Sequence, residues 1–521
     1  MLKASGAMAA ATLLSRVLGL VREQAYMYFL GTTWVNDAFQ YAFTIPNLFR
    51  RLLGEGALTA AFIPVFKEKE KSHGEAEMWR AANAVISGLV VSACVVIALV
   101  MIGLSIALDA HHFSGRWELT LRLLRVMFPY MLLVCLAAVM MGMLNARGHF
   151  FIPAMGATML NVVMIGSVFW LAPKFGVGLP QEQRLPVQIF ALAYGVLAAG
   201  VAQAAFQLPV LWRDGFRYQW VSPWRNPTVQ RVVRQMIPGT IGVAAFQINV
   251  ALVQGVALFV GTGIVSSFNG AVRLMELPQG MFGISLATYL LPTLSGLAAE
   301  KNYPEFRTTL RHGLATLIFL NLIAAVLLVA LAEPIVRLLF ERGAFTAVST
   351  KHVTYALKCL APGLVMFSTV NILARAFYAL GDTGTPMKIS IVCLVLNFSI
   401  ACALLIPLRE GGPGIANAVT SILNVALLLF ALRKKLGRLE MESLRKSFLL
   451  LLWMAVLAGI VALMSWKFWE IKFGHETLEL KIGAVFVPAI LAGMIYGILA
   501  LAFKIPAAKE ILDLFLARFR R

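Results

Sequence analysis

The chain has 521 residues, of which 60% are hydrophobic and only 13% are charged, and its mean hydropathy is +0.81. A soluble protein carries about 25% charged residues, so the composition excludes a set of water-soluble domains and indicates an integral membrane protein. The formal net charge is +20. The positive-inside rule places such a surplus of cations on one side of a bilayer, which argues against nucleic acid as a partner.

A membrane-spanning helix needs about 20 mostly apolar residues. The fold class is therefore predicted to be all-α, with about fourteen transmembrane helices near residues 5–30, 34–66, 81–108, 119–145, 150–173, 187–212, 235–260, 264–298, 308–332, 350–380, 386–407, 412–433, 446–468 and 481–503. Connections rich in Lys and Arg alternate with connections that have almost none. The rich set includes 67–80, 213–234 and 433–446, so both termini are predicted to be cytoplasmic.

The two halves of the chain repeat the spacing of two prolines and a glycine. Gly148 and Pro153 follow Pro129 by 19 and 24 residues, and the second half has both spacings again at Pro362, Gly381 and Pro386. Matched bends and turns predict matched backbone. We expect two six-helix lobes and two appended helices, with boundaries at 1–213 (first lobe), 214–234 (cytoplasmic linker), 235–435 (second lobe) and 436–521 (appended pair and amphipathic C-terminal segment).

Polar and charged residues inside the spans are informative because an Arg or Asp near a helix centre costs roughly 2.5–3.5 kcal/mol. The first span has Ser15, Arg16, Arg22 and Glu23, the second has Asp37, Asn47, Arg50, Arg51 and Glu55, and the eighth has Ser266, Arg273 and Glu276. We expect these groups to face an aqueous cavity between the lobes. The alternative is snorkelling toward helix ends together with structural ion pairs, and it is strongest for Arg50, Arg51 and Glu55.

A cavity with surplus arginine favours an anionic ligand. Guanidinium groups form bidentate hydrogen bonds with phosphate oxygens, and two phosphates can engage the three groups of Arg16, Arg22 and Arg273. A small carboxylate would need fewer arginines. The residues by themselves therefore predict an anionic, phosphate-bearing cargo.

The motifs around these residues carry a family resemblance. They are Ser15-Arg-Val-Leu-Gly-Leu-Val-Arg-Glu23, Asp37-Ala-Phe39, Pro46-Asn-Leu-Phe-Arg-Arg51, Glu55-Gly-Ala57, Phe62-Ile-Pro64, Arg273-Leu-Met-Glu-Leu-Pro278 and Leu339-Phe-Glu-Arg-Gly-Ala-Phe-Thr346. Together they resemble the bacterial lipid II flippase family MurJ (MviN), in the same order and through the twelfth span.

The resemblance implies the fold of the multidrug/oligosaccharidyl-lipid/polysaccharide exporters, with the two lobes facing each other in a V. It implies that the protein moves lipid II, the undecaprenyl-pyrophosphate-linked peptidoglycan precursor, between leaflets of the bacterial inner membrane by alternating access. Carried over by motif, the pyrophosphate would bind Arg16, Arg22 and Arg273, with Glu23 and Asp37 as acidic neighbours and Arg50, Arg51 and Glu55 at a cytoplasmic gate. The appended helices would form a groove for the lipid tail. The implied partners are lipid II, membrane lipids and the cell-wall synthesis machinery, and no cofactor or metal is implied.

One departure concerns ion coupling. Some members of the family look sodium-coupled through acidic residues in the seventh and eleventh spans, whereas this chain has Gln247 and Asn249 in one and Asn397 and Ser399 in the other. Because hard cations prefer carboxylate oxygens, such a sodium site is disfavoured. Membrane potential is the expected drive, at about 2.3 kcal/mol per charge per 100 mV.

Other functions remain open at this point. A flippase for another polyprenyl-linked sugar and a multidrug exporter share the expected fold, although an exporter of cationic drugs should have carboxylates in its cavity. A membrane enzyme acting on polyprenyl pyrophosphate needs a His nucleophile or clustered carboxylates for Mg²⁺. All seven His residues lie in or beside loops, so we expect no catalytic residues. A structural scaffold would leave the arginines within the spans unexplained.

Overall fold

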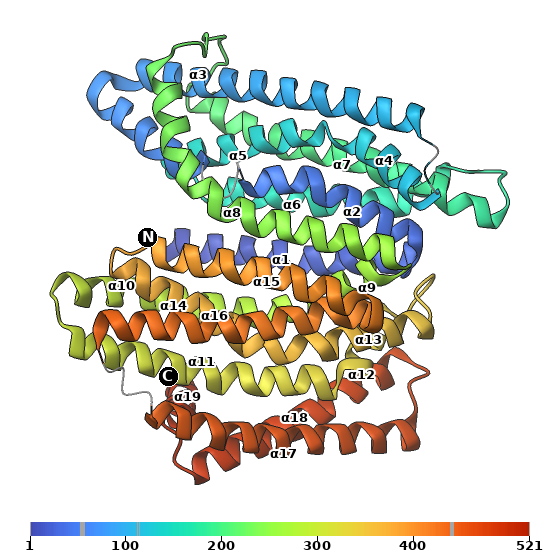
Figure 1. The fold of residues 1–521 in the computed structure, drawn as a ribbon, viewed down its shortest axis with the longest axis vertical. Coiled ribbons are helices and arrows are strands. Elements are labelled where there is room, and N and C mark those ends of the chain that lie inside the picture. Colours follow the sequence, from blue (N-terminus) through green and yellow to red (C-terminus); the bar gives the residue numbers. More distant parts are fainter. Residues whose placement is uncertain (1, 53–57, 112, 114, 438–441, 520–521) are drawn as a thin grey trace. The chain divides into compact units, whose positions relative to one another are not determined.

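The computed structural model describes residues 2–52, 58–111, 113, 115–437 and 442–519. Over these residues the regular structure is helical, and no strand is present. The chain forms two compact units, Met1–Leu258 and Phe259–Arg521 (Figure 1). Each unit is a bundle of long helices, which confirms the all-α class.

The first unit begins with a long helix and continues as a bundle. Its helices are α1 (Leu2–Leu30), α2 (Trp34–Phe49), α3 (Leu58–Ala110), α4 (Gly115–Met127), α5 (Tyr130–Ala146), α6 (Phe151–Gly166), η2 (Ser167–Leu171), η3 (Ala172–Lys174), α7 (Gln181–Arg213) and α8 (Pro227–Val260).

The second unit contains the remaining helices. They are α9 (Ile264–Pro278), η4 (Gln279–Ile284), α10 (Ser285–Ala299), α11 (Tyr303–Ala330), α12 (Ala332–Phe340), α13 (Ala347–Leu360), η5 (Ala361–Gly363), α14 (Leu364–Ala379), α15 (Gly384–Leu408), η6 (Arg409–Gly411), α16 (Gly412–Leu436), α17 (Glu442–Phe473), α18 (Leu478–Ala502) and α19 (Pro506–Phe519).

Each predicted span is mainly helical over its described residues, and the span at 119–145 is interrupted by a turn at Phe128 and Pro129. By length and hydropathy, nine helices in the described part of the chain qualify as membrane-spanning, or ten if α4 and α5, which meet at 43°, form one span. This number is lower than fourteen partly because the continuous stretch Gly384–Leu436 contains two of the predicted spans. A chain with this many apolar helices is a multi-pass membrane protein, and the count of fourteen stays a prediction. The short helix α12 was not anticipated.

The backbone match expected from the repeated spacing is present. Gly148 and Gly381 both have positive φ, at 88° and 73°. Each glycine N–H donates to the carbonyl three residues back, and the next residue donates to the carbonyl five residues back, which is a Schellman-type helix end. Each preceding helix pair is interrupted at the matched proline, Pro129 between α4 and α5 and Pro362 within η5.

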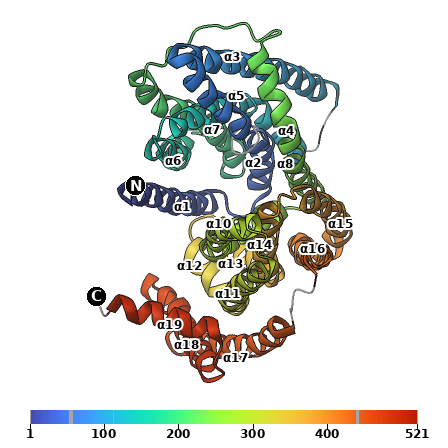
Figure 2. The same ribbon diagram turned by 90° about the vertical axis from the view of Figure 1, so that its left-hand side faces the viewer.

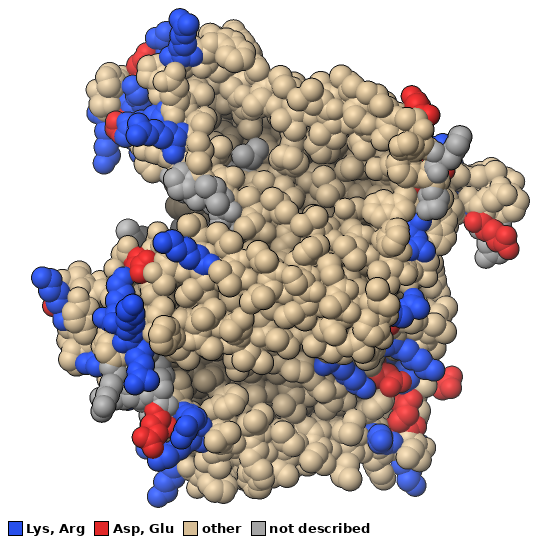
Figure 3. Space-filling view, in the orientation of Figure 1, with Lys and Arg blue, Asp and Glu red and all other residues tan. Residues whose placement is uncertain are grey.

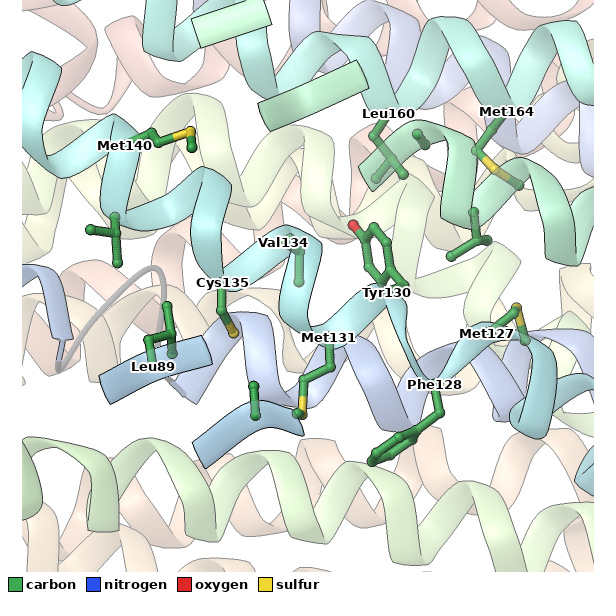
Figure 4. Close-up of a cluster of buried hydrophobic side chains, with 14 of the residues drawn as sticks. Leu89, Met127, Phe128, Tyr130, Met131, Val134, Cys135, Met140, Leu160 and Met164 are labelled. Carbon is green, nitrogen blue, oxygen red and sulfur yellow. The ribbon is translucent and has the colours of Figure 1, made fainter. Parts of the chain in front are cut away.

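A cluster of fully buried side chains fixes the core of the first unit (Figure 4). Tyr130 and Cys135 on α5 have no exposed surface, and the Tyr130 hydroxyl donates to Gln203 Oε1 on α7 at 3.4 Å. A Cβ added to Gly200 on α7 would lie 2.8 Å from Tyr130 Cδ2. Glycine is therefore required where α7 crosses α5.

The appended helices α17 and α18 pack against α11 and α12 within the second unit (Figure 2). Small residues on α17 allow the close approach: a Cβ added to Gly459 would lie 2.4 Å from Val326 Cγ1 on α11. On α18, the Tyr496 hydroxyl donates to the Phe319 carbonyl at 3.0 Å. Small residues at such contacts are the usual means of helix association in lipid, where the hydrophobic effect contributes little.

Charged side chains gather at the ends of the helices in both units, and the flanks between them are uncharged (Figure 3). On the face shown, each unit has one end that carries mainly Lys and Arg and another end where both signs occur. This pattern is typical of helices whose middle sections lie in hydrocarbon.

Candidate functional site

Arg22 on α1 is the most buried of the predicted arginines, with 8% of its surface exposed. Its guanidinium carbon lies 5.6 Å from the centre of the Tyr26 ring, one helical turn further on, which is a cation–π contact. The Arg22 Nε atom is buried and has no hydrogen-bond partner among the residues that the structure describes. Because an unpaired buried N–H costs free energy, an anion that accepts this hydrogen bond would complete the site.

The other predicted residues of α1 differ in exposure. Arg16 is exposed, Ser15 is half-buried and Glu23 is buried. The backbone carbonyl of Ser15 accepts a hydrogen bond from Asn161 Nδ2 on α6 at 3.2 Å. This contact fixes α1 against α6, so the role of Ser15 in packing comes from its main chain.

Asp37 lies in the first turn of α2 and is fully buried. Thr33 caps this helix by accepting from the Asn36 N–H at 3.4 Å, and Asn36 Nδ2 donates to the Gly31 carbonyl at 2.6 Å. A carboxylate near a helix N-terminus is stabilised by the helix dipole. These two hydrogen bonds thus fix the turn between α1 and α2, directly before Asp37.

A line of polar contacts, which we call the α2–α8 seam, joins these two helices. Thr44 Oγ1 donates to Gln254 Oε1 at 2.8 Å, and Arg51 Nη1 donates to Gln247 Oε1 at 3.4 Å. At the C-terminal end of α2, Arg50 Nε donates to Asn47 Oδ1 at 2.8 Å. Arg50 therefore has a partner in its own helix, and Arg51 has one on α8. Whether either residue belongs to a gate stays a prediction.

In the second unit, Arg273 and Glu276 form the pair that their spacing predicts. Arg273 Nη1 lies 2.8 Å from Glu276 Oε2, and the two side chains are 40% and 45% exposed. Ser266 is fully buried near the start of α9, and its hydroxyl donates to the Gly263 carbonyl at 3.4 Å. Directly after α9 the helix widens into the π-helical turn η4, and π-helical turns are frequent at functional sites.

The structure places Arg16, Arg22, Glu23 and Asp37 in the first unit and Ser266, Arg273 and Glu276 in the second. Glu55 lies outside the described residues. Sequence reasoning missed the amide partners Asn161 and Gln254. The available signal was that both are polar residues inside apolar spans, although sequence alone does not reveal which helix faces them.

Among the residues that the structure describes, no three His, Cys, Asp or Glu side chains lie close enough together to hold a metal ion. Asn397 on α15, in the eleventh predicted span, donates to Asn417 Oδ1 at 2.8 Å and to Thr420 Oγ1 at 3.2 Å on α16. These contacts give that amide a role in packing α15 on α16.

Long apolar helices, a duplicated backbone pattern and charged groups within the spans define a membrane transporter rather than an enzyme. The sequence matches the family described as "Lipid II flippase MurJ" over residues 26–481. It is 34% identical over 509 residues, or 95% of this chain and 93% of the relative, to the "Probable lipid II flippase MurJ" of Bdellovibrio bacteriovorus. The chain belongs to the MurJ lipid II flippase family.

Solved structures share the fold. One called "Lipid II flippase MurJ, inward closed conformation" has a TM-score of 0.76 and 23% identity, covering 95% of this chain and 98% of that chain. An inward-facing multidrug resistance transporter of the MATE family and MOP superfamily has a TM-score of 0.64 and 16% identity, covering 84% and 99%. The chain therefore shares its fold with both of these proteins.

Proposed function

We propose that this protein moves lipid II from the cytoplasmic to the outer leaflet of the bacterial inner membrane by alternating access, and that Arg16, Arg22 and Arg273 bind the pyrophosphate. The observation that carries the proposal is Arg22. It is a buried guanidinium in an apolar span, and its Nε has no hydrogen-bond partner in the described part of the chain. A pyrophosphate oxygen supplies the missing acceptor and the compensating charge.

The need for such a protein follows from the chemistry of the cargo. Sugars, a peptide and two phosphates cannot cross hydrocarbon, because each polar group that loses its hydrogen bonds costs several kcal/mol. The arginines replace water around the pyrophosphate while the polyprenyl tail stays in lipid. Rocking of the lobes 1–213 and 235–435 about the bound headgroup then exposes it on the other side. The helices of 436–521 guide the tail.

The orientation rests on the distribution of cations. The predicted cytoplasmic connections carry most of the Lys and Arg. One end of each unit is rich in these residues on the face of Figure 3, which supports assigning that end to the cytoplasm. With both termini in the cytoplasm, membrane potential acts on the charged cargo and on the arginines that hold it. Membrane lipids and the cell-wall synthesis machinery are the expected neighbours.

Release of the cargo requires a competitor for the arginines. Glu276 supplies one, since its carboxylate lies 2.8 Å from Arg273 and can take over that guanidinium when the pyrophosphate leaves. We expect Glu276→Gln to bind lipid II more tightly and to turn over more slowly. Unchanged transport together with unchanged affinity for lipid II would contradict this release step.

The test of the function is depletion of the native flippase in a bacterium, rescue by this chain, and measurement of lipid II in the outer leaflet. Wild type should restore outer-leaflet lipid II, whereas Arg22→Ala and Arg273→Ala should not at equal membrane abundance. Arg80→Ala is the matched control, because Arg80 is 69% exposed and pairs only with nearby Glu77 among the described residues. It should rescue fully.

Each other outcome has a definite meaning. Full rescue by both arginine variants would assign Arg22 and Arg273 a structural role. Failure of the wild type, although it is folded in the membrane, would favour a flippase for another polyprenyl-linked sugar.

A further inference from the structure

A second polar site lies in the first unit, away from the residues described above. It is a pocket of about 430 Å³ between the end of α3, one face of α4 along most of its length and the first half of α7. Its polar and aromatic lining consists of Asp109, Glu118, Arg122, Arg125, Phe190 and Tyr194. The lipid II mechanism uses none of these residues.

The charges in the pocket are only partly compensated. Arg122 Nη2 lies 2.6 Å from Glu118 Oε1, one turn away on α4. Within the described part of the chain, neither Asp109 nor Arg125 belongs to an ion pair or a side-chain hydrogen bond. The pocket therefore offers one cation and one anion, both exposed, to a ligand.

The two charges lie at different depths in the predicted span. Asp109 directly follows the span that ends at 108, so it lies at the membrane surface. Arg125 lies six residues inside the span that begins at 119, which corresponds to about 9 Å along a helix. An Arg that faces lipid at this depth is costly unless an anion accompanies it.

A zwitterionic phospholipid presents the complementary order of charges. Its ammonium is outermost and its phosphate lies deeper, which corresponds to Asp109 and then Arg125. Leu108, Val126 and Phe190 give the same pocket an apolar lining for the start of the acyl chains. The Tyr194 hydroxyl, exposed in the same pocket, provides a second donor to the phosphate.

We propose that this pocket binds a phospholipid with a primary ammonium headgroup, of the phosphatidylethanolamine class. Arg125 and Tyr194 hold the phosphate, and Asp109 accepts hydrogen bonds from the ammonium. The leaflet is the outer one in the orientation proposed above. The binding itself depends neither on that orientation nor on lipid II transport.

The experiment is a titration of the purified full chain in detergent with short-chain phospholipids, with affinity measured by thermophoresis. Phosphatidylethanolamine should bind about tenfold more tightly than phosphatidylcholine, whose quaternary ammonium donates no hydrogen bond. Asp109→Asn should remove this preference, and Arg125→Ala should weaken binding of both lipids about tenfold. The matched control Arg342→Ala, an exposed arginine in the second unit, should leave both affinities unchanged.

Three results would overturn the proposal. They are equal affinity for the two lipids in the wild type, wild-type affinity in Arg125→Ala, and tighter binding of the anionic phosphatidylglycerol than of phosphatidylethanolamine. If Arg125 served only to stabilise the C-terminal end of α4, its loss would lower the melting temperature and leave lipid affinity unchanged, which also contradicts the site. If the alanine variant does not fold, Arg125→Lys takes its place. Its affinity for both lipids is expected to be lower than that of wild type but still measurable.

Discussion

The turn at 145–149 in the first unit and the turn at 378–382 in the second have the same backbone but opposite charges. In the first, cationic Arg147 lies before the positive-φ glycine and His149 lies after it. In the second, the residue after the glycine is Asp382. The two turns therefore share a backbone conformation but differ in the charged residues with which they can form ion pairs.

In the first unit the turn acts as a clamp. Arg147 Nη1 donates to Glu70 Oε1 at 2.7 Å and to Glu75 Oε1 at 2.8 Å, and these carboxylates lie on either side of Gly74, where α3 leaves helical geometry at φ 83°. Asp214, at the end of α7, lies 3.1 Å from His149 Nε2. One arginine thus braces the bend of α3.

The second unit needs no such clamp. At the corresponding place α10 ends and α11 begins anew, and Asn302 caps α11 by accepting from the Glu305 N–H at 3.3 Å. The turn at 378–382 instead stabilises its own next helix: Asp382 accepts from the Thr385 N–H at 3.0 Å and pairs with Lys435 at 2.8 Å. A helix that carries its own cap does not require a cation from elsewhere.

The largest expected effect comes from removing the two cations. Arg147→Ala removes the partner of Glu75 and leaves Glu70 with Lys67 alone beside the bend, so we expect the free energy of unfolding to fall by about 1.5 kcal/mol. Lys435→Ala leaves Asp382 bonded to Thr385 and should cost about 0.5 kcal/mol. Thermal unfolding in detergent measures the difference, and hydrogen exchange at 70–78 should increase only in Arg147→Ala. Equal losses of stability in both variants would show that the two turns depend on their cations to the same extent.

A second expected effect concerns what the two turns share. Gly148→Ala and Gly381→Ala each force a side chain into left-handed geometry, although an added Cβ meets no atom within 4 Å at either position. Backbone strain alone should cost about 1 kcal/mol in both. Gly103→Ala is the control, because Gly103 lies within helical α3 with the same open surroundings, and alanine there should stabilise the helix. Unequal losses at Gly148 and Gly381 would break the backbone equivalence.

The parts of the structure that sequence predicted are those set by local rules. The spans follow from apolar length, the matched turns follow from glycine and proline, and the Arg273–Glu276 pair follows from helical spacing. The all-α class was predicted correctly on this basis, and the family was predicted correctly from the resemblance of the motifs.

Tertiary neighbours decided the rest. Arg16 and Arg22 have similar sequence surroundings, yet Arg16 is exposed while Arg22 is buried over Tyr26, because the helices around α1 differ along its length. The α2–α8 seam depends on which face of α8 meets α2, and no local pattern fixes that face. The short helix α12 escaped because its nine residues lie below the length that hydropathy detects.

The smallest expected effect is a pH dependence that belongs to the second turn. The hydrogen bond from Lys435, followed by that from the Thr385 N–H, lowers the pKa of Asp382 from 3.8 to about 2. A carboxylate whose pKa is depressed on folding stabilises the protein above its unfolded pKa, and this contribution is lost as pH falls through the folded pKa. Because Asp382 lies near the surface, we expect only about 0.5 kcal/mol.

Asp382→Asn isolates this contribution. The variant should have a lower melting temperature than wild type at pH 7 and at pH 5. This difference should decrease between about pH 4 and pH 2, where wild-type Asp382 takes up its proton. When both proteins also carry Lys435→Ala, the difference in melting temperature caused by Asp382→Asn should decrease at a higher pH, because the pKa of Asp382 then moves back toward 3.8. A gap that stays constant from pH 5 to pH 2 would mean that the Asp382 carboxylate contributes through its shape rather than its charge. The second turn would then differ from the first in sequence alone and not in electrostatics.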